Sequence, residues 1–505
     1  MRFFQSRFFV HAAALLAGAA LVLAFAPFFL WPLAMLAPAA LMLLWLKAPS
    51  RWAVSIGYCF GLGFFGFGVS WVFHSIYEFG QAPFAFAALL TLIFVLIFAL
   101  YPALLGWLQR PADPTQQHMG WRLLVVMPAA WVCLEWLRGW LFTGFPWLQL
   151  GYSQLLADGG TIFAAVAPAT GVLGISYIVM LSVGLMLLLL LGRGWPRWGA
   201  LAGIVTLAAG LYGLGHQHWS KPVGDPITVA LVQGNIAQEN KWEPDWLIPT
   251  VERYSRLTDA HMDADLIVWP EVALPGTYQL FRDFVLNPIQ RELEKYGAEL
   301  LTGVLYEGDA GRIYNSLVRI GDDPEFYFKR HLVPFGEVIP FREWMPWLNK
   351  LVLVAVDDLQ PGTEPVLLHA AGQVIGSSIC YEDAFGEEMA DFLPQATMLV
   401  NVSNDAWFGP TIAPEQHLQI AQMRALELGR PLLRATNTGV TAIIDAQGRV
   451  TARAPVFETT VLTGEISGRR GYTPFARWRN LPLIALLAIL VIAGATIIKR
   501  KEKSQ

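Results

Sequence analysis

The chain of 505 residues is strongly apolar, since 55% of its residues are hydrophobic and only 15% are charged. Soluble domains carry about 25% charged residues, so this composition excludes a disordered chain, an ordinary cytosolic enzyme and a nucleic-acid binder that relies on bulk charge. The three cysteines are too few for a disulfide framework.

The net charge of −4 hides regions of very different composition. Residues 1–215 contain nine Lys/Arg and four Asp/Glu, whereas residues 216–480 contain 22 Lys/Arg and 34 Asp/Glu, a net charge of −12. Residues 481–505 again contain more basic than acidic side chains. We therefore expect a membrane domain over 1–215, a soluble domain over 216–480, and a last membrane helix with a basic tail over 481–505.

Eight apolar stretches are candidate membrane spans, because a helix needs about 20 apolar residues to cross the hydrocarbon. They cover residues 8–26, 28–46, 53–76, 83–108, 121–139, 165–191, 197–215 and 481–498. The first two are nearly contiguous and are expected to form a tight hairpin. The alternative for the first stretch, a signal peptide, is disfavoured because no small-residue cleavage site is followed by a hydrophilic chain.

The basic residues beside these spans gather in alternate connections. They are Arg2, Arg7, Lys47, Arg51, Arg110, Arg122, Arg193, Arg197, Lys499, Arg500, Lys501 and Lys503. The other connections carry little positive charge, and two of them contain Glu78 and Asp158. The positive-inside rule then predicts cytoplasmic termini and places 216–480 on the outer face, which is the periplasm for a bacterial inner membrane.

The soluble segment alternates strand-like and helix-like patterns. Short apolar runs predict strands at 228–233, 266–269, 300–305, 315–320, 374–379, 397–402, 432–436, 441–445 and 460–466. Amphipathic patterns predict helices at 245–261, 281–296 and 415–428, the last ending at Gly429. This alternation is typical of an α/β domain.

Cys380 is the one cysteine of the soluble segment, since Cys59 and Cys133 lie inside predicted spans. It ends an apolar strand and begins a polar turn, which is a position that exposes a nucleophile at the sheet edge beside backbone N–H groups. A buried structural cysteine is the alternative. A lone thiol in an oxidising compartment is, however, easier to explain if it takes part in chemistry.

A thiol nucleophile needs a base and an electrostatic partner. Glu271 is the best candidate for the base, because it follows the apolar run 266–269 and so lies at the end of a buried strand. A surface position at a helix start is its alternative. His417 falls in a predicted helix, and we expect it to be a structural or substrate-side residue rather than the base.

Two further charged residues follow another strand-like run, Phe326-Tyr-Phe. Lys329 there can favour the thiolate and donate hydrogen bonds to a developing oxyanion, and Glu337 can hold the lysine ammonium. Taken alone, a surface lysine and an ordinary loop glutamate are the simpler interpretations.

Three motifs in order resemble the nitrilase, or carbon–nitrogen hydrolase, superfamily: Trp-Pro-Glu at 269–271, Lys-Arg-His-Leu-Val-Pro-Phe-Gly-Glu at 329–337, and Ser-Ile-Cys-Tyr-Glu-Asp at 378–383. The resemblance covers about residues 225–470. It implies a four-layer α-β-β-α sandwich with a Glu-Lys-Cys triad, in which Glu271 is the general base, Lys329 stabilises the oxyanion and Cys380 is the nucleophile. Glu337 corresponds to a second glutamate of the superfamily.

The whole chain, with spans on both sides of this domain and the segments 401–409 and 434–439, resembles the membrane-bound family of acyltransferases that completes lipoprotein maturation. The implied fold is a multi-span α-helical membrane domain plus an α/β nitrilase-like sandwich. The implied reaction moves an acyl chain from a phospholipid, at the sn-1 position of phosphatidylethanolamine, through a thioester to the α-amine of a diacylglyceryl-cysteine apolipoprotein. No cofactor, metal or nucleic acid is implied.

The resemblance also implies supporting residues. The backbone N–H of Tyr381 joins Lys329 in stabilising the oxyanion, and Glu382 follows in the same motif. Hydrolysis of the thioester must be suppressed, so the site is expected to be dry or filled with lipid.

Aromatic residues near the motifs are candidates for lipid contact. Trp344 and Trp347 follow Glu337, and we predict that they lie on a lipid-facing arm, with a core element of the sandwich as the alternative. Trp242 is a candidate aromatic of the site, or an ordinary loop residue. Within a span, Glu135 and Arg138 are spaced to form a pair, or alternatively to cap the span at the interface.

Other function classes remain to be separated from acyl transfer. A membrane-tethered amidase acting on a soluble amide would share the triad without needing eight spans. A transporter would need more ionisable residues inside the spans than Glu135 and Arg138. A structural lipoprotein-docking protein would not depend on Cys380.

Overall fold

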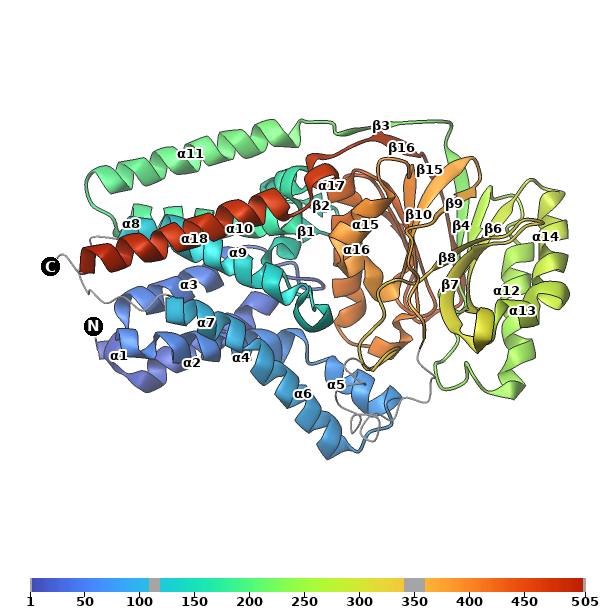
Figure 1. Cartoon of the computed structure of the whole chain (residues 1–505), viewed down its shortest axis with the longest axis horizontal. Coiled ribbons are helices and arrows are strands. Elements are labelled where there is room, and N and C mark those ends of the chain that lie inside the picture. Colours follow the sequence, from blue (N-terminus) through green and yellow to red (C-terminus); the bar gives the residue numbers. More distant parts are fainter. Residues whose placement is uncertain (1, 109–118, 340–358, 503–505) are drawn as a thin grey trace.

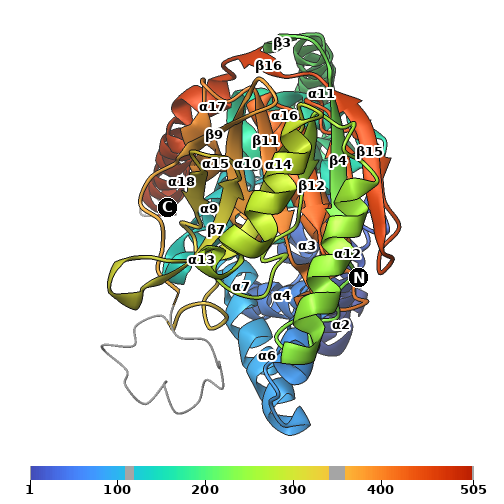
Figure 2. The same cartoon turned by 90° about the vertical axis from the view of Figure 1, so that its right-hand side faces the viewer.

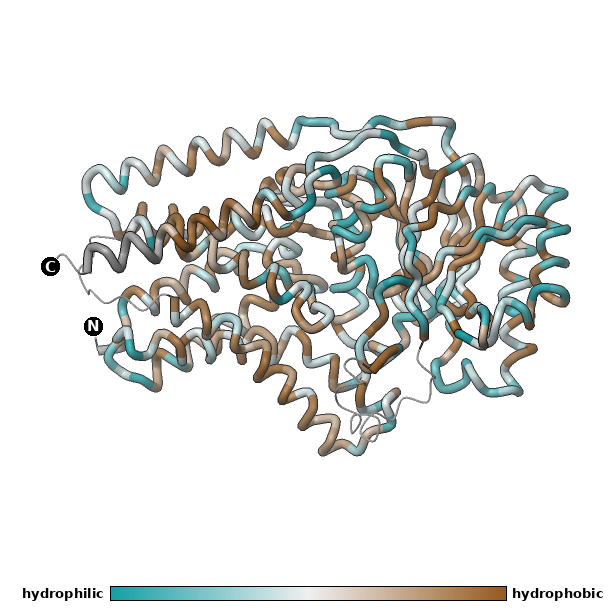
Figure 3. Tube along the Cα trace, in the orientation of Figure 1, coloured by the Kyte–Doolittle hydropathy of each residue, from teal (hydrophilic) through white to brown (hydrophobic). Residues whose placement is uncertain are grey.

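A computed structural model describes residues 2–108, 119–339 and 359–502 (Figure 1). The helices of both chain ends form one layer, on the left of Figure 1, and an α/β domain lies beside it on the right. The short helix α1 (Arg2–Gln5) and the C-terminal end of α18 (Leu481–Glu502) both lie at the end of the helical layer that is far from the α/β domain. The helical layer is also the more hydrophobic part, whereas the outermost helices of the α/β domain carry many polar residues (Figure 3).

The helical layer contains helices in all eight regions where the sequence predicts spans. Its longer helices are α2 (Arg7–Val22), α3 (Leu33–Lys47), α4 (Ala53–Gly68), α6 (Phe84–Phe98), α7 (Leu100–Leu108), α9 (Met127–Arg138), α10 (Ala167–Leu191), α11 (Trp195–Gly215) and α18. Short pieces join them: α5 (Val72–His74), η2 (Ser75–Phe79), α8 (Met119–Trp121) and η4 (Arg122–Val126).

The lengths of these helices differ from the prediction. Four helical segments of the described residues are long and apolar enough to span a membrane: Phe84–Leu108, Met119–Arg138, Ile162–Leu191 and Trp195–Gly215. A fifth region is a broken pair, Ser50–Gly68 and Val72–Phe79, bent by 58°. The predicted spans at 8–26 and 28–46 are wrong in extent, because the chain turns over residues 23–32 and leaves helices of 16 and 15 residues.

Close packing of α2 against α4 depends on glycine. A side chain at Gly18 would meet the carbonyl oxygen of Phe60 at 2.0 Å, and one at Gly63 would meet that of Leu15 at 2.0 Å. Small residues let helix backbones approach in this way inside membranes. The hairpin of α2 and α3 is thereby held tightly against the third helical region.

The α/β domain contains two six-stranded sheets of similar design. The first sheet has the order β15-β4-β5-β6-β7-β8 and the second has the order β14-β13-β12-β11-β10-β9. In each sheet three neighbouring strands are parallel, β4, β5 and β6 in the first and β10, β11 and β12 in the second. The strands are β4 (Ile227–Gln233), β5 (Leu266–Val268), β6 (Glu299–Glu307), β7 (Ile313–Arg319), β8 (Glu325–Phe328), β9 (Leu367–Ala370), β10 (Gln373–Ile379), β11 (Met398–Ser403), β12 (Leu432–Thr436), β13 (Ala442–Ile444), β14 (Val450–Arg453) and β15 (Thr460–Ile466).

The two sheets pack face to face and helices cover their outer faces. On the far side from the helical layer lie α12 (Leu247–Asp259), α13 (Tyr278–Phe281) and α14 (Asn287–Glu294), seen in front in Figure 2. On the near side lie α15 (Gly386–Met389) and α16 (Ala413–Leu428). The domain is thus the predicted four-layer α-β-β-α sandwich.

The core explains why these strands read as continuous apolar runs. On β4, Val229 and Leu231 lie in the core between the sheets, whereas Ala230 and Val232 lie in the core under the outer helices. A strand buried on both faces needs apolar residues at every position rather than at alternate ones.

The predicted strands are all present, within a few residues of the predicted limits, and so are the three predicted helical regions. Within residues 216–480, the sequence patterns missed β9, β14 and two short strands, β3 (Ser220–Pro222) and β16 (Arg469–Gly471), which pair with each other. β14 is half-exposed and therefore lacks a continuous apolar run. Helix α16 ends at Gly429 as expected, because this residue adopts a left-handed conformation with φ of 63°.

Helix α16 also joins the two parts of the molecule. Its residues Gln416, Gln419 and Gln422 are three apart, so they lie along one side of the helix. Gln416 accepts a 2.7 Å hydrogen bond from the indole N–H of Trp147, and Gln419 donates one of 2.7 Å to the carbonyl of Leu155. These contacts fix the helical layer directly beside the sheet that carries Cys380.

Candidate active site

Cys380 lies where β10 ends and the 3₁₀ turn η12 (Cys380–Ala384) begins. Its backbone has a φ of 53°, a left-handed conformation that is unfavourable for a residue with a side chain. The carbonyl oxygen of Cys380 accepts hydrogen bonds from Asn401 at 3.2 Å and from the His417 ring at 3.3 Å, and these contacts hold the strained turn. The side chain is largely buried.

Glu271 follows β5 at the corresponding edge of the other sheet. Each carboxylate oxygen accepts one hydrogen bond, Oε1 from the side-chain amide of Asn315 and Oε2 from the backbone N–H of Asn404, both at 2.8 Å. Asn404 follows β11, so Glu271 is fixed from both sheets. Glu271 is therefore buried, with 7% of its surface exposed.

Lys329 directly follows β8 and is 1% exposed. Its ammonium lies 2.7 Å from Oε1 of Glu337 and 3.5 Å from Oε1 of Glu271. Asn315 donates to both glutamates, at 2.8 and 3.3 Å, and so joins the two carboxylates around the lysine. The backbone N–H of Val333 holds the second oxygen of Glu337 at 2.8 Å.

The charges of Lys329, Glu271 and Glu337 shift the pKa values of the lysine and of the Cys380 thiol. Burial disfavours the ammonium of Lys329, but Glu337 and Glu271 outweigh burial and raise the pKa of this lysine above its ordinary value. Burial and the Glu271 carboxylate raise the pKa of the Cys380 thiol, and Lys329 acts in the opposite direction. Burial and Glu271 thus favour the neutral thiol of Cys380, whereas the Lys329 ammonium favours the thiolate.

Glu382 connects the segment that carries Lys329 to the turn that carries Cys380. Its Oε1 accepts hydrogen bonds from the hydroxyl of Tyr327 at 2.9 Å and from the backbone N–H of Arg330 at 2.6 Å. Its Oε2 accepts one of 2.7 Å from the backbone N–H of Ile379. The carboxylate thereby fixes the distance between two strands of different sheets.

A charge-balanced cluster lies beneath the Cys380 turn, and its side chains are fully buried. The ring of His417 bonds to Asp383 at 2.9 Å and to Asp405 at 3.1 Å, and Arg434 bonds to the same two carboxylates at 3.1 and 3.0 Å. Burial and Arg434 disfavour protonation, but the two aspartates raise the pKa of His417 to about 8. This contact set agrees with the structural role predicted for His417.

Tyr381 points from the Cys380 turn to the helical layer. Its hydroxyl donates a 3.0 Å hydrogen bond to the carbonyl of Gly144, and its ring lies 6.3 Å from that of Trp147 in a stacked arrangement. The segment 144–147 therefore forms the wall of the site next to Tyr381.

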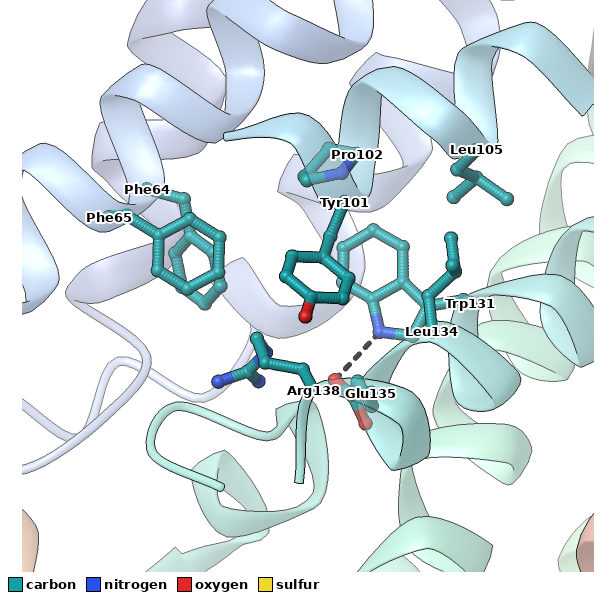
Figure 4. A pocket seen from close by; sticks show the side chains of 9 residues that line it. All are labelled: Phe64, Phe65, Tyr101, Pro102, Leu105, Trp131, Leu134, Glu135 and Arg138. Carbon is teal, nitrogen blue, oxygen red and sulfur yellow. Dashed lines mark hydrogen bonds between the residues drawn. The ribbon is translucent and has the colours of Figure 1, made fainter. Parts of the chain in front are cut away.

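Glu135 and Arg138 of α9 bind the segment that forms this wall. Figure 4 shows both side chains with Trp131, whose indole N–H donates a 2.8 Å hydrogen bond to Glu135. Arg138 donates to the carbonyls of Phe145 at 2.7 Å and Trp147 at 2.5 Å, and Glu135 accepts from the backbone N–H of Leu150 at 2.8 Å. Among the described residues, Glu135 and Arg138 make no ion pair with each other. Of the two alternatives expected from the sequence, the ion pair is therefore not formed, because Arg138 binds backbone carbonyls and Glu135 binds the N–H of Leu150 and the indole of Trp131.

The remaining candidates give a mixed result. Trp242 is 53% exposed, and Trp344 and Trp347 lie outside the described residues. Sequence patterns missed Asn315 and Lys241. Asn315 is a polar residue inside a predicted apolar strand, and Lys241, beside Trp242, is a buried lysine that donates a 3.2 Å hydrogen bond to the carbonyl of Glu271.

Metal chemistry has no support from the part of the chain that the structure describes. No group of three or more His, Cys, Asp or Glu side chains there is arranged to hold a metal ion.

Two family models match this chain. The model described as Carbon-nitrogen hydrolase matches residues 228–473, and the model described as Apolipoprotein N-acyltransferase N-terminal domain matches residues 17–185. These matches confirm the superfamily resemblance of the soluble segment.

Curated relatives match over nearly the whole chain. A protein of Methylococcus capsulatus named apolipoprotein N-acyltransferase is 47% identical over 97% of this chain and 96% of its own length. Proteins of the same name from Nitrosomonas europaea and Vibrio cholerae are 41% and 39% identical, covering 97% and 93% of this chain and 97% and 94% of their own lengths.

Solved structures match the α/β domain. A carbon–nitrogen hydrolase superfamily protein of Xanthomonas campestris is 18% identical, with a TM-score of 0.37, over 48% of this chain and 91% of its own. A nitrilase superfamily member of Saccharomyces cerevisiae is 18% identical, with a TM-score of 0.37, over 49% of this chain and 92% of its own.

Proposed function

The chain belongs to the apolipoprotein N-acyltransferase family, and from this premise we propose that Cys380, Glu271 and Lys329 are its catalytic triad. The observation that carries this assignment is the buried contact of 3.5 Å between the Lys329 ammonium and the Glu271 carboxylate. The charge of Lys329 also acts against the raised pKa of the Cys380 thiol. The two glutamates are held by Asn315, Asn404 and the backbone, so their positions are set before substrate arrives.

The first half-reaction forms a thioester. Glu271 takes the thiol proton of Cys380 while the sulfur attacks the ester carbonyl of a phospholipid, by family resemblance at the sn-1 position of phosphatidylethanolamine. Lys329 and the backbone N–H of Tyr381 stabilise the oxyanion. The ester C–O bond then breaks, Glu271 returns its proton to the departing alkoxide, and the lysophospholipid leaves.

The second half-reaction transfers the chain to an amine. The free α-amine of a diacylglyceryl-cysteine apolipoprotein attacks the thioester, Glu271 takes a proton from the amine, and an amide forms as the C–S bond breaks. Glu271 then returns the proton to the sulfur of Cys380. Glu337 keeps Lys329 in place throughout, and Glu382 fixes the segment of Lys329 against the Cys380 turn.

Residues 1–215 are proposed as the membrane domain, 216–480 as a periplasmic catalytic domain, and 481–505 as a last membrane helix with a cytoplasmic tail. The alternating basic connections support this topology. The placement of α1 and the end of α18 at the same end of the helical layer, away from the α/β domain, supports cytoplasmic termini (Figure 1). Both lipid substrates would then reach the site from the bilayer.

Conversion of a diacylglyceryl lipopeptide to its N-acylated form, with phosphatidylethanolamine vesicles as donor, tests this function. We expect Cys380→Ala and Cys380→Ser to abolish conversion and Cys133→Ala, a matched cysteine in the helical layer, to retain it. Full conversion by Cys380→Ala would contradict the assignment. Hydrolysis of a soluble amide without any lipid dependence would instead support the amidase alternative.

A further inference from the structure

A cavity of about 460 Å³ lies in the helical layer on the side that adjoins the α/β domain. It forms where α2 ends, where α4 and α5 bend apart by 58°, and where Thr411 and Ile412 precede α16. Its lining is mostly apolar, with Val22, Leu23 and Phe67 among its residues. The helix break therefore produces a space that a straight helix would fill.

The cavity reaches the outer surface of the helical layer. Phe28 and Phe67 line it and are nevertheless 44% and 62% exposed. In a membrane domain such a surface faces lipid tails rather than water. The apolar lining and the lipid surroundings therefore both favour a hydrocarbon chain as the ligand of the cavity.

The unpaired indole N–H of Trp71 indicates that the ligand also carries a hydrogen-bond acceptor. Trp71 lines the cavity and is 8% exposed, and its indole N–H has no hydrogen-bond partner among the described residues. An indole N–H is a donor only, so it needs an acceptor oxygen. His74 lines the same cavity one helical turn later and offers a second polar contact.

An aromatic partition separates this cavity from Cys380. The ring of Trp71 lies 4.9 Å from that of Phe408 and 5.3 Å from that of Trp147. Trp147 in turn stacks on Tyr381, the neighbour of Cys380. Trp147 and Tyr381 thus lie in contact order between Trp71 and Cys380, and we infer that a chain held beside Trp71 is not the chain that reacts.

We propose that this cavity binds one acyl chain of a bilayer phospholipid that does not react, with the ester carbonyl oxygen of that chain accepting the indole N–H of Trp71. The cavity volume of about 460 Å³ lies within the range of about 300–1,000 Å³ found for small-molecule sites. The ester end lies beside Trp71 and His74, and the hydrocarbon lies along Val22 and Phe67. The bound lipid supports Trp71 and, through it, the partition behind Tyr381.

Photochemical labelling of the reconstituted full-length chain tests the proposal. The probe is phosphatidylethanolamine with a diazirine on one acyl chain, in vesicles of phosphatidylethanolamine and phosphatidylglycerol, with labelled peptides identified by mass spectrometry. We expect enrichment in peptides that contain residues 19–28 and 67–74. Cys380→Ala is expected to label equally, so this result is independent of the proposed catalytic triad.

Two substitutions on α2 provide a matched pair. Ala19 lines the cavity, so Ala19→Trp should fill it and remove the enriched labelling. Leu16 is 65% exposed on the same helix and does not line the cavity, so Leu16→Trp should leave the labelling unchanged. Trp71→Phe keeps a ring but loses the N–H donor, and we expect labelling at subsaturating probe to fall about threefold to tenfold.

Three outcomes would overturn the proposal. Labelling spread evenly over all lipid-facing helices and insensitive to Ala19→Trp would show that no specific chain is bound. Unchanged labelling of Trp71→Phe would remove the ester contact. Displacement of the probe by a diacylglyceryl lipopeptide would assign the cavity to the acceptor rather than to a phospholipid.

Discussion

The buried charges near Cys380 and those of α9 have different partners. In the α/β domain, Lys329 pairs with Glu271 and Glu337. In the helical layer, Glu135 and Arg138 are equally buried but bind backbone groups of residues 145–150. The difference fits the proposal that the α/β domain supplies the reacting groups and that Glu135 and Arg138 fix the segment beside Tyr381.

The largest expected effect comes from the reacting group. Glu271→Gln removes the base but keeps an oxygen for its hydrogen bonds, so we expect the rate of acyl-enzyme formation to fall about 10³-fold. Quench-flow measurement of lysophospholipid release gives this rate. Glu465→Gln, an exposed glutamate of the same domain, is the control that should keep the wild-type rate. A rate within tenfold of wild type for Glu271→Gln would remove this residue from the base role.

Substitution of Glu382, which links the two sheets, should have the next largest effect on the rate of acyl transfer. Glu382→Gln places an amide against backbone donors, so at least one charge-assisted hydrogen bond is lost, at a cost of about 1.5–3 kcal/mol. We expect thermal unfolding at lower temperature together with a tenfold to hundredfold slower acyl transfer, which is about 1.4 kcal/mol of activation free energy for each factor of ten. Tyr327→Phe removes a single donor to the same carboxylate and should show a smaller change in both measurements. Equal changes in the two variants would contradict a linking role for the carboxylate.

Substitution of Arg138, which holds the 145–147 backbone in the helical layer, should slow acyl transfer less. Arg138→Met removes two hydrogen bonds to the 145–147 backbone, and we expect acyl transfer to slow about tenfold while the raised pKa of Lys329 and the thiol stay as they are. The pH profile of the reaction should therefore keep its shape while its height falls. A changed shape would show that Arg138 acts on the reacting groups directly.

The last prediction concerns the pH dependence of stability, not the rate, and involves the cluster beneath Cys380. The pKa of His417 is raised to about 8, against about 6.5 in an unfolded chain, so protonation stabilises the folded state. This contribution, about 2 kcal/mol, is complete below pH 6.5 and is lost as pH rises through 8. The midpoint of thermal unfolding of the wild type should thus fall between pH 6.5 and pH 9, and that of His417→Gln should change less. Parallel curves would contradict a protonated His417.

Much of this arrangement follows from local patterns. Glu271 and Cys380 were identified at strand ends because continuous apolar runs mark buried strands, and such ends meet at the edge of a sandwich. The roles of Asn315 and Glu382 were not identifiable from local patterns, since each depends on contacts between strands far apart in the sequence. The partners of Arg138 depend on how the chain turns after α9. The spacing of apolar residues in the sequence does not predict that turn. The shorter helices at 7–22 and 33–47 show the same limit, because apolar composition continues through the turn between them.

The central claim is that Cys380 carries the acyl chain between the two half-reactions. Peptide mass spectrometry of the wild-type chain, incubated with phosphatidylethanolamine vesicles and no acceptor, tests this claim most directly. We predict an acyl group on Cys380 in amounts equal to the lysophospholipid released, and its removal when diacylglyceryl lipopeptide is added. N-acylated lipopeptide without any acyl group ever detected on Cys380, or with the group on another residue, would contradict the account.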